Sequence, residues 1–494
     1  MPVARSGRPV RPLRAVLLAT GVLALGLALA GAGAGTGAAT AAEIEVPPGG
    51  PGSVALTIHD RTTVVAEQRS ASLPAGESVL AFPDVPSGAD AASVRLRAAG
   101  RAPDAFLVLE RALSADVPNR HRLLELSVGR EIGLLIDDQG ADAPPRRTTA
   151  RVLSVAEDVI LEMDGDIRVG LPGDLVLDRL PEGLRPSPTL LATVRADAGG
   201  PADLALTYLT GGLGWTADYT LDLDAAMTGG DLTGWATVTN SSGRSFRDAR
   251  LTLAAGTVNT GGGGRGMAEM DQRAGMVAAA MPPPPSPQAQ GGLHFYPIDR
   301  PVDLAHRQSK QLALVNAPGL TVEPRFVIPD TGSSVYGSPR VDETRLHARR
   351  HLVLSNTDDA GLGRPLPAGT VRVWQPGPDG APRFLGADRI GHTAVGTEAT
   401  LALGTDFDVT AERRRLDFRR IGERVTETEH AVVLRNGKPD QAVRVTVEAD
   451  LPGEWTLLSQ SRESVRESAS RVTWTVEVPP EGEERLTYTV RTRF

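Results

Sequence analysis

The chain has 494 residues, of which 41% are hydrophobic and 23% charged, a composition typical of a folded protein with several domains. It contains no cysteine, which excludes a disulfide framework, a zinc–thiolate or iron–sulfur site, a catalytic thiol and a lipoprotein anchor. A formal net charge of −8 argues against nucleic acid as the main partner.

The first 42 residues have the order of segments that is typical of a secretory signal peptide. Four arginines precede an apolar run from Ala15 to Ala30, and a Gly/Ala stretch then leads to the small-residue site Ala39-Thr40-Ala41. The alternative is an uncleaved membrane anchor, but this run is shorter than the roughly 20 apolar residues that a bilayer crossing needs. We predict cleavage near Ala41 or Ala42, a periplasmic or secreted location, and no transmembrane span in the mature chain. Loss of the four arginines brings the net charge to −12.

Apolar and polar residues alternate with a period of two along the rest of the chain, which predicts an all-β fold. Val54, Leu56 and Ile58 show this alternation near the start, and Leu204 and Leu206 show it in the middle. Near the C-terminus the alternation runs through Val443–Val447, Val472–Val478 and Leu486–Val490, with turn signals between these runs. The one short segment that favours a helix is Asn119–Ser127.

We predict several antiparallel β-sandwich and small β-barrel modules. After the signal peptide (1–42) these are an N-terminal β-rich domain (43–118), a small β-barrel-like module (119–189), a central β-sandwich (190–410) and an immunoglobulin-like β-sandwich (411–494). Residues 260–292 are rich in Gly and Pro and poor in apolar bulk, which predicts a disordered insertion within the central domain. This insertion holds four of the seven methionines, Met267, Met270, Met276 and Met281.

The sequence lacks the common catalytic motifs. It has no G-x-S-x-G nucleophile elbow, no phosphate loop ending in Gly-Lys and no H-E-x-x-H. His347 and His351 are four residues apart, but on a strand this spacing separates them by about 13 Å, too far for one metal ion. The methionines of the insertion could bind a soft cation such as Cu(I), although such methionines are more often incidental. We predict no catalytic residue, no metal and no cofactor.

Two groups of side chains are candidate interaction residues. Trp235 and Trp374 fall on the opposite phase from their apolar neighbours, which favours either a sugar platform or burial against a neighbouring domain. A run of arginines could bind an anionic envelope polymer, a lipid headgroup or an acidic partner, or it could be a solvated linker into the last module. The candidate residues of this run are Arg413, Arg414, Arg415, Arg419 and Arg420.

Several blocks in the second half of the chain resemble the bacterial domain-of-unknown-function family numbered 4139, which overlaps proteins labelled mucoidy-inhibitor-like. The resemblance covers roughly residues 190–494. It implies an exported β-rich protein and supplies no reaction and no catalytic residues, and the coiled coil that precedes this region in many relatives has no heptad counterpart here. The blocks that carry it are Leu209–Tyr219, Leu232–Asn240, Phe246–Leu251, Phe295–Val302, Gly363–Val373 and Asp406–Val409.

These patterns favour an exported, non-catalytic protein that acts through surface contacts in the cell envelope, with an unknown envelope protein or polymer as partner. One alternative is a hydrolase of envelope polymers, which requires clustered carboxylates or a His–carboxylate pair in a cleft. Another is a protein that binds carbohydrate or a soft metal. Within the family-like block, Trp215 and Tyr219 are four residues apart and share one strand face, and we expect Trp215 to be mostly buried and structural.

Overall fold

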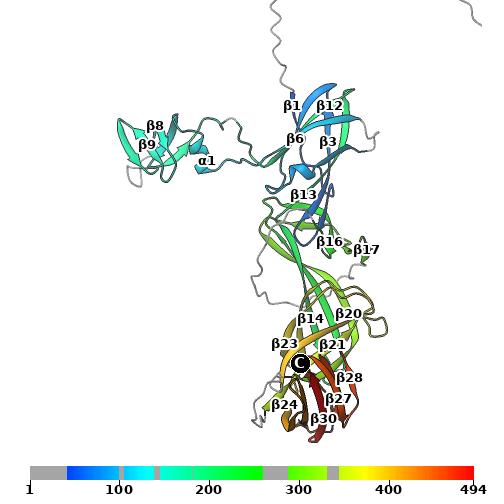
Figure 1. Cartoon of the computed structure of the whole chain (residues 1–494). Helices are drawn as coiled ribbons and strands as arrows, with labels where there is room; N and C mark the ends of the chain where they lie inside the picture. Colours follow the sequence, from blue (N-terminus) through cyan, green and yellow to red (C-terminus); the bar gives the residue numbers. More distant parts are fainter. Residues whose placement is uncertain are drawn as a thin grey trace, which may run out of the picture. The chain divides into compact units, whose positions relative to one another are not determined.

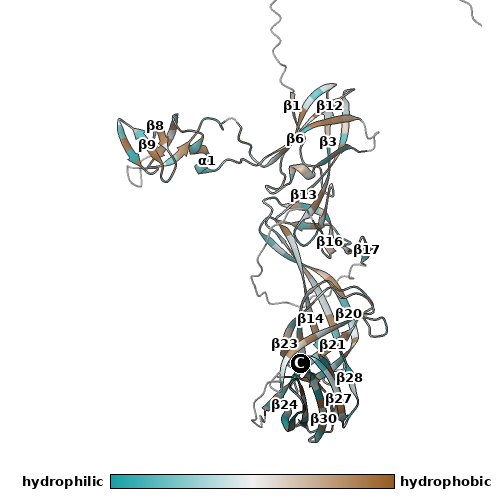
Figure 2. Cartoon of the chain, in the orientation of Figure 1, coloured by the Kyte–Doolittle hydropathy of each residue, from teal (hydrophilic) through white to brown (hydrophobic). Residues whose placement is uncertain are grey.

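The described residues fold almost entirely into β-strands, as the alternating sequence predicts (Figure 1). The computed structural model describes residues 42–99, 105–137, 145–181, 183–259, 287–330 and 344–493. Hydrophobic and hydrophilic residues interleave along the strands (Figure 2). Apart from residue 42, the predicted signal peptide lies outside the described residues, as do the four methionines of the predicted insertion and its residues 260–286.

Two sheets are built mainly from the first half of the chain. One has the strand order β1 (Ala42–Glu45), β4 (Gly76–Phe82), β12 (Thr189–Ala196) and β6 (Phe106–Ser114). The other has the order β17 (Gln288–Gln290), β18 (Leu293–Pro297), β16 (Phe246–Ala255), β2 (Val54–Ile58), β3 (Thr63–Leu73), β13 (Gly200–Thr210) and β5 (Arg95–Ala98), with β19 (Val302–Leu304) paired to β16 and the 3₁₀ turn η1 (Ala91–Ser93) before β5.

Most neighbouring strands are antiparallel, but β1 with β4 and β2 with β16 are parallel. The pairing also links segments from different predicted modules, because β2 and β3 pair with β16 and β13. The domain boundaries stay a prediction, since strand pairing alone does not define where a chain divides.

The residues between β6 and β12 form a small sheet of their own. Its order is β10 (Asp166–Val169), β9 (Ile160–Met163), β8 (Arg146–Ser154), β7 (Glu131–Ile136) and β11 (Asp174–Val176). Helix α1 (Arg120–Glu125) begins after Asn119, whose side chain accepts the backbone N–H of Arg122, so the predicted short helix is confirmed. In the part of the chain that the structure describes, no helix combines the length and the apolarity that a bilayer crossing requires.

A long sheet takes up most of the second half of the chain. Its order is β23 (Pro382–Ile390), β22 (Gly369–Pro376), β14 (Leu213–Leu223), β15 (Gly229–Asn240), β20 (Gln308–Ile328), β21 (Thr344–Ser355), β24 (Glu398–Arg420), β25 (Val425–Asn436), β30 (Glu483–Arg493) and β27 (Glu454–Gln460). Three further strands, β26 (Val443–Asp450), β28 (Ser464–Arg466) and β29 (Arg471–Val478), join it through the pairing of β26 with β20. The immunoglobulin-like classification of the C-terminal part stays a prediction.

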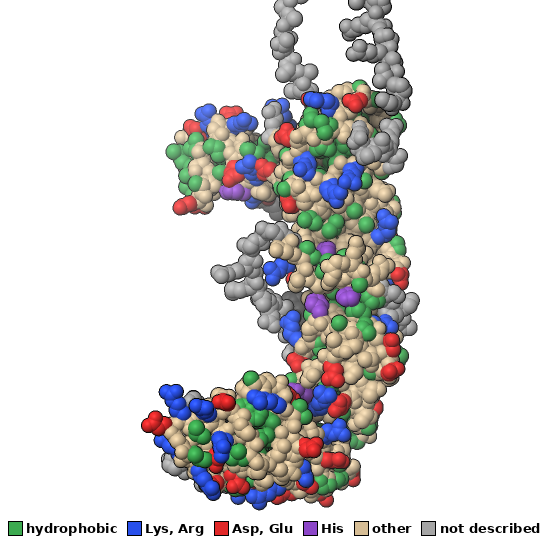
Figure 3. Space-filling model, turned by 45° about the vertical axis from the view of Figure 1, so that its right-hand side comes forward, with side chains coloured by type: hydrophobic (Ala, Val, Ile, Leu, Met, Phe, Trp, Pro, Cys, Tyr) green, Lys and Arg blue, Asp and Glu red, His purple; other side chains and the backbone are tan. Residues whose placement is uncertain are grey.

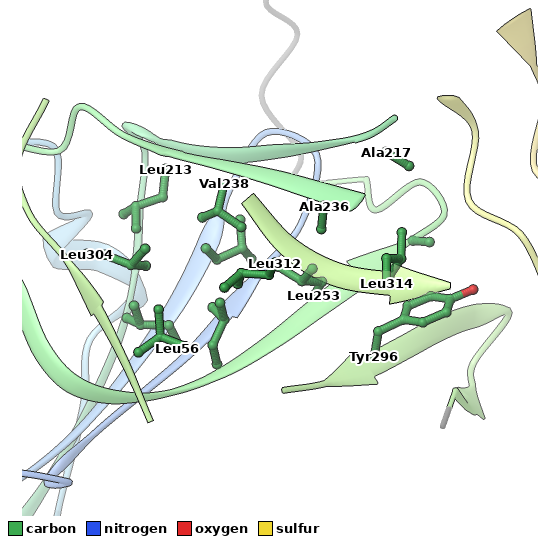
Figure 4. Packing of buried hydrophobic residues seen from close by; sticks show 14 of the residues in the cluster. Leu56, Leu213, Ala217, Ala236, Val238, Leu253, Tyr296, Leu304, Leu312 and Leu314 are labelled. Atoms are coloured by element: carbon green, nitrogen blue, oxygen red, sulfur yellow. The ribbon is translucent and has the colours of Figure 1, made fainter. Parts of the chain in front are cut away.

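Three strands of this sheet, β20, β21 and β24, take part in two hydrophobic clusters. β20 contributes Leu312 to the first cluster and Phe326 to the second, and β24 contributes Leu401 and Val409 in the same way. In the first cluster, side chains from β2, β14, β15, β16 and β20 point into one interior (Figure 4). The two clusters are therefore connected by continuous hydrogen-bonded strands.

The arginine run of residues 413–420 belongs to one of these strands, so its interpretation as a solvated linker is wrong. β24 pairs along its length with β21 and β25. The predicted start of a module at residue 411 falls inside this strand. The alternation that would have revealed the strand is obscured by shifts of register in both pairings.

A buried charge network links β3, β13 and the loop between β15 and β16. Glu67 accepts hydrogen bonds from Arg69, Arg244 and the hydroxyl of Tyr208, and all four side chains are buried. Burial opposes the ionisation of Glu67, but the two arginines and the tyrosine outweigh it and hold the pKa of Glu67 below its ordinary value. Removal of Glu67 would leave the two buried guanidinium groups without the carboxylate that they share.

Three asparagines at or just after strand ends use their side-chain amides to hold the following loops. Asn240, Asn356 and Asn436 are each at most 2% exposed. Each donates to two or three backbone carbonyl groups and accepts a backbone N–H in return. These amides satisfy backbone groups that the loops bury away from water.

An aromatic stack crosses the second cluster. The ring of Tyr488 lies between Trp474 and His430, with centroid distances of 4.4 and 5.0 Å. Burial, and after it the charge of Arg413, lowers the pKa of His430 to about 4, although Asp330 acts in the opposite direction. His430 is therefore packed as a neutral ring at neutral pH.

We expect Asn356→Ala to lower the free energy of unfolding by about 3 kcal/mol, because it removes the buried amide that the carbonyl groups of Arg364, Thr393 and Ala394 share as their donor. Urea denaturation followed by tryptophan fluorescence measures the change. The matched control is Asn316→Ala, an exposed site where the change should stay within about 0.5 kcal/mol. Equal effects of the two substitutions would contradict the role assigned to Asn356.

His430 makes the stability of the protein depend on pH. The folded-state pKa of about 4 lies below the ordinary value of 6.5, so between these values only the unfolded chain takes up the proton. The contribution is complete above pH 6.5 and is lost as the pH falls toward 4, by about 3 kcal/mol. In urea denaturation at pH 7 and pH 4.5, His430→Gln should lose less stability than the wild type. His392→Gln, at an exposed histidine, should keep the wild-type loss.

Candidate ligand-binding hollow on the outer sheet face

The candidate site lies on the outer face of β14, β15 and β22. Antiparallel pairing places Asp218 opposite Trp235 and Asp222 opposite Asp231, and parallel pairing places Trp374 beside Asp222. Because alternate residues of a strand share one side of the sheet, these five side chains lie on the same face. The opposite face of β14 carries buried residues of the first hydrophobic cluster.

A hollow of about 680 Å³ lies at one end of this face, where β14, β15, β20 and β22 meet. Its lining includes the carboxylates of Asp222, Asp224 and Asp231, the indole of Trp374 and the amide of Gln375. Among the described residues that line it, none carries a positive charge. The volume falls within the range of ordinary small-molecule sites.

Glycines shape the floor of the hollow. A Cβ atom at Gly230 would lie 2.6 Å from the carbonyl oxygen of Asp222, so the β14–β15 hairpin closes only with glycine at this position. Gly319 on β20 has a φ of +67°, the left-handed conformation that glycine adopts without strain. Because these glycines have no side chain, the floor of the hollow exposes backbone groups to a ligand.

Polar contacts fix the wall of the hollow. Asp224 accepts the backbone N–H of Thr228 (3.0 Å), and Asp231 accepts that of Gly319 (2.8 Å). The amide of Gln375 donates to two carbonyl oxygens of the β14–β15 turn (3.3 and 3.0 Å). These bonds hold the turn, β20 and β22 in one arrangement around the hollow.

The carboxylates influence one another. Burial, and after it the negative charge of Asp231, raises the pKa of Asp222 above its ordinary value. Direct pairing across an antiparallel sheet brings their Cβ atoms to about 5 Å. The hollow is therefore a site of negative potential.

Two aromatic rings form a rim beside the hollow, which Trp374 lines and which Phe384 adjoins through its contact with Trp374. Trp374 is half-buried, and its ring centroid lies 5.0 Å from that of Phe384 on β23, with the planes tilted by 56°. Phe384 is 54% exposed. The pair thus presents apolar surface beside the carboxylates.

Trp235 lies outside the lining of the hollow. Pairing geometry puts it about 16 Å from Trp374, four residues along the strand and two strands across. It is half-buried, and its indole N–H is buried with no hydrogen-bond partner among the described residues. Beside it, Asp218 pairs with Arg372 (3.0 Å) and accepts the hydroxyl of Thr237 (3.1 Å).

The arginine run does not join this site, and its first members are held by acids. Arg413 is 6% exposed and pairs with Asp330 (2.7 Å), so it adds no charge to the surface. Arg414 is exposed and pairs with Glu412 (2.5 Å).

The remaining arginines are half-buried or exposed. Arg415 lies over the ring of Phe418 (5.5 Å), and Arg419 pairs with Asp417 (2.7 Å). Arg420 is exposed. Around the C-terminal strands, at the bottom of Figure 3, Lys and Arg side chains alternate with Asp and Glu.

The predicted orientation of Trp215 and Tyr219 is confirmed, because both lie on the inner face of β14. Tyr219 is buried and donates to the carbonyl of Pro367 (2.8 Å). Trp215 is half-buried rather than fully buried; it packs against the first cluster and donates to the carbonyl of Ala254 (3.4 Å).

Sequence reasoning singled out Trp374 but missed the carboxylates and the amide around it. The available signal was local: Asp222-Leu223-Asp224 and Gly229-Gly230-Asp231 flank one hairpin turn, so alternate acids fall on the same side of both strands. Gln375 and Phe384 gave no signal, because their roles depend on pairing between distant strands.

The fold defines an all-β protein made of several sheets, with a ligand-sized hollow at the end of one of them. The chain belongs to the family of domains of unknown function numbered 4139 (DUF4139), whose model matches residues 204–494. This range contains every residue of the hollow named above and confirms the resemblance drawn from the sequence. No curated protein matches the chain.

Proposed function

We propose that the protein is exported and acts in the cell envelope as a non-catalytic binding protein, with the hollow as its ligand site. The hollow carries this proposal, because it combines a concave floor, an aromatic rim and convergent polar groups, the usual features of a small-molecule site. Export is proposed from the arrangement of the first 42 residues.

Binding is favoured over catalysis because two of the three carboxylates already have a structural role. Asp224 and Asp231 each accept a backbone N–H of the turns that form the hollow. Carboxylates engaged in this way keep free lone pairs and can still accept hydrogen bonds from a ligand.

A hydrolase of envelope polymers is the second candidate, and one observation favours it. Asp222 and Asp231 lie opposite each other, and the pKa of Asp222 is raised, as a general acid requires. Residues paired in this way have Cβ atoms about 5 Å apart, which permits the carboxyl separation of about 5 Å that is typical of retaining glycosidases.

Export is tested on the full chain expressed in a bacterial host. The purified protein should begin at Ala42 or Glu43, as measured by mass spectrometry of its N-terminal peptide. A variant with Leu25→Arg and Leu27→Arg, which interrupts the apolar run, should remain full length inside the cell. Full-length wild-type protein in the cytosol would contradict export.

Binding at the hollow is tested by site-specific photo-crosslinking in intact envelopes. With p-benzoylphenylalanine in place of Phe384, at the rim, an envelope component should be captured. The same probe in place of Phe407, which is 87% exposed and contacts His347 rather than a residue that lines the hollow, is the matched control. Absence of capture from position 384, or identical capture from both positions, would contradict a binding role for the hollow.

An activity assay on the purified protein distinguishes binding from hydrolysis. Release of reducing ends from envelope glycans is measured for the wild type and for Asp222→Asn. A binding protein releases none in either form, whereas a hydrolase releases them only when Asp222 is intact.

A further inference from the structure

We propose that the hollow and the adjoining outer face bind an uncharged glycan chain. This inference rests on the proposed function and names its ligand. The ligand must satisfy three features of the surface: an aromatic rim, an excess of hydrogen-bond acceptors, and a negative potential without a compensating cation.

The aromatic rim fits the apolar side of a sugar ring. Trp374 is half-buried and Phe384 is exposed, and their tilted rings contact each other next to polar groups. A pyranose has the matching character, since its C–H groups form an apolar face and its hydroxyl groups surround the edge. Contact between an aromatic face and such a ring removes apolar area from water while the hydroxyl groups stay free to bond.

The polar lining selects a ligand that donates hydrogen bonds. Asp222, Asp224 and Asp231 offer only acceptor oxygens when ionised, and the amide N–H groups of Gln375 are already used by the β14–β15 turn. Apart from the hydroxyl of Thr321, the polar side chains that line the hollow therefore offer acceptors, and sugar hydroxyl groups supply matching donors.

The outer face continues the polar surface beyond the hollow. Hydroxyl side chains occupy the same side of the sheet between Trp374 and Trp235 and also just past Trp235, where Thr216 pairs with Thr237, and each is at least partly exposed. A ladder of hydroxyl groups over about 16 Å suits a ligand with repeated hydroxyl groups better than a single small cation. Its members are Thr216, Thr220, Thr233, Thr237 and Thr370.

The charge of the hollow excludes acidic polymers. Its three carboxylates face no positive side chain among the described lining residues, and Arg372 on the adjoining face is paired with Asp218. A uronate or phosphate group placed there would be repelled at short range. The segment of the ligand that enters the hollow therefore carries no negative charge, and the row of hydroxyl groups beside it favours an uncharged sugar chain over a compact cation.

The inference is tested by calorimetric titration of the full protein with three hexasaccharides, of N-acetylglucosamine (neutral), glucosamine (cationic) and galacturonic acid (anionic). The neutral chain should bind and the anionic chain should not. Trp374→Ala and Phe384→Ala should each weaken binding of the neutral chain by about tenfold, while Phe407→Ala should leave it unchanged. Phe384 is exposed, so its substitution keeps the test valid if the Trp374 variant fails to fold.

A second variant tests whether the carboxylates of the hollow exclude an anionic glycan. Asp222→Asn with Asp224→Asn should raise binding of the anionic chain relative to the neutral one, because the repulsion is removed. Preferred binding of the cationic or the anionic chain by the wild type would overturn the inference. If no glycan binds but position 384 still captures an envelope component, the glycan inference fails and the proposed function stands. If position 384 captures nothing, the proposed function fails.

Discussion

Continuous backbone hydrogen bonding along β20, β21 and β24 is the constraint on which the second half of the molecule depends. Each strand buries apolar side chains in two hydrophobic clusters, so neither cluster can lose its packing without affecting a strand of the other. The ion pair between Arg413 and Asp330 lies on the same strands, since Arg413 belongs to β24 and Asp330 follows β20. Hydrophobic burial and a buried charge pair therefore act on the same elements.

The hollow depends on this arrangement because β20 forms part of its floor. Gly319 donates its N–H to Asp231 on β15, and the neighbouring Leu320 is fully buried in the first cluster. The position of the acidic wall is thus set by a strand that the core holds in place. Sites on such elements keep their geometry better than sites on loops alone, which suits a protein that recognises a ligand by shape.

The sequence was sufficient for the fold class and for many strands, because a period of two reports directly which side chains are buried. β26, β29 and β30 lie where Val443–Val447, Val472–Val478 and Leu486–Val490 predicted them. The sequence did not reveal which strands pair with each other, because strands such as β2 and β16 are paired although they lie nearly 200 residues apart in the chain. The candidate site could be predicted only in part for the same reason. The alternation of β22 showed that Trp374 lies on the outer face, but the residues around it come from four strands, and their positions depend on how these strands are paired in the folded sheet.

The asparagine at the end of β25 bears on the chemical ageing of the protein. Asn436 precedes Gly437, and an Asn–Gly pair deamidates readily because glycine has no Cβ to hinder attack of its backbone nitrogen on the side chain. In the folded chain that nitrogen is engaged with the carbonyl of Asp408, and the amide is buried. Deamidation would place a carboxylate against the carbonyl oxygens to which the amide now donates hydrogen bonds. The rate of this reaction therefore reports how often the C-terminal part of the molecule opens.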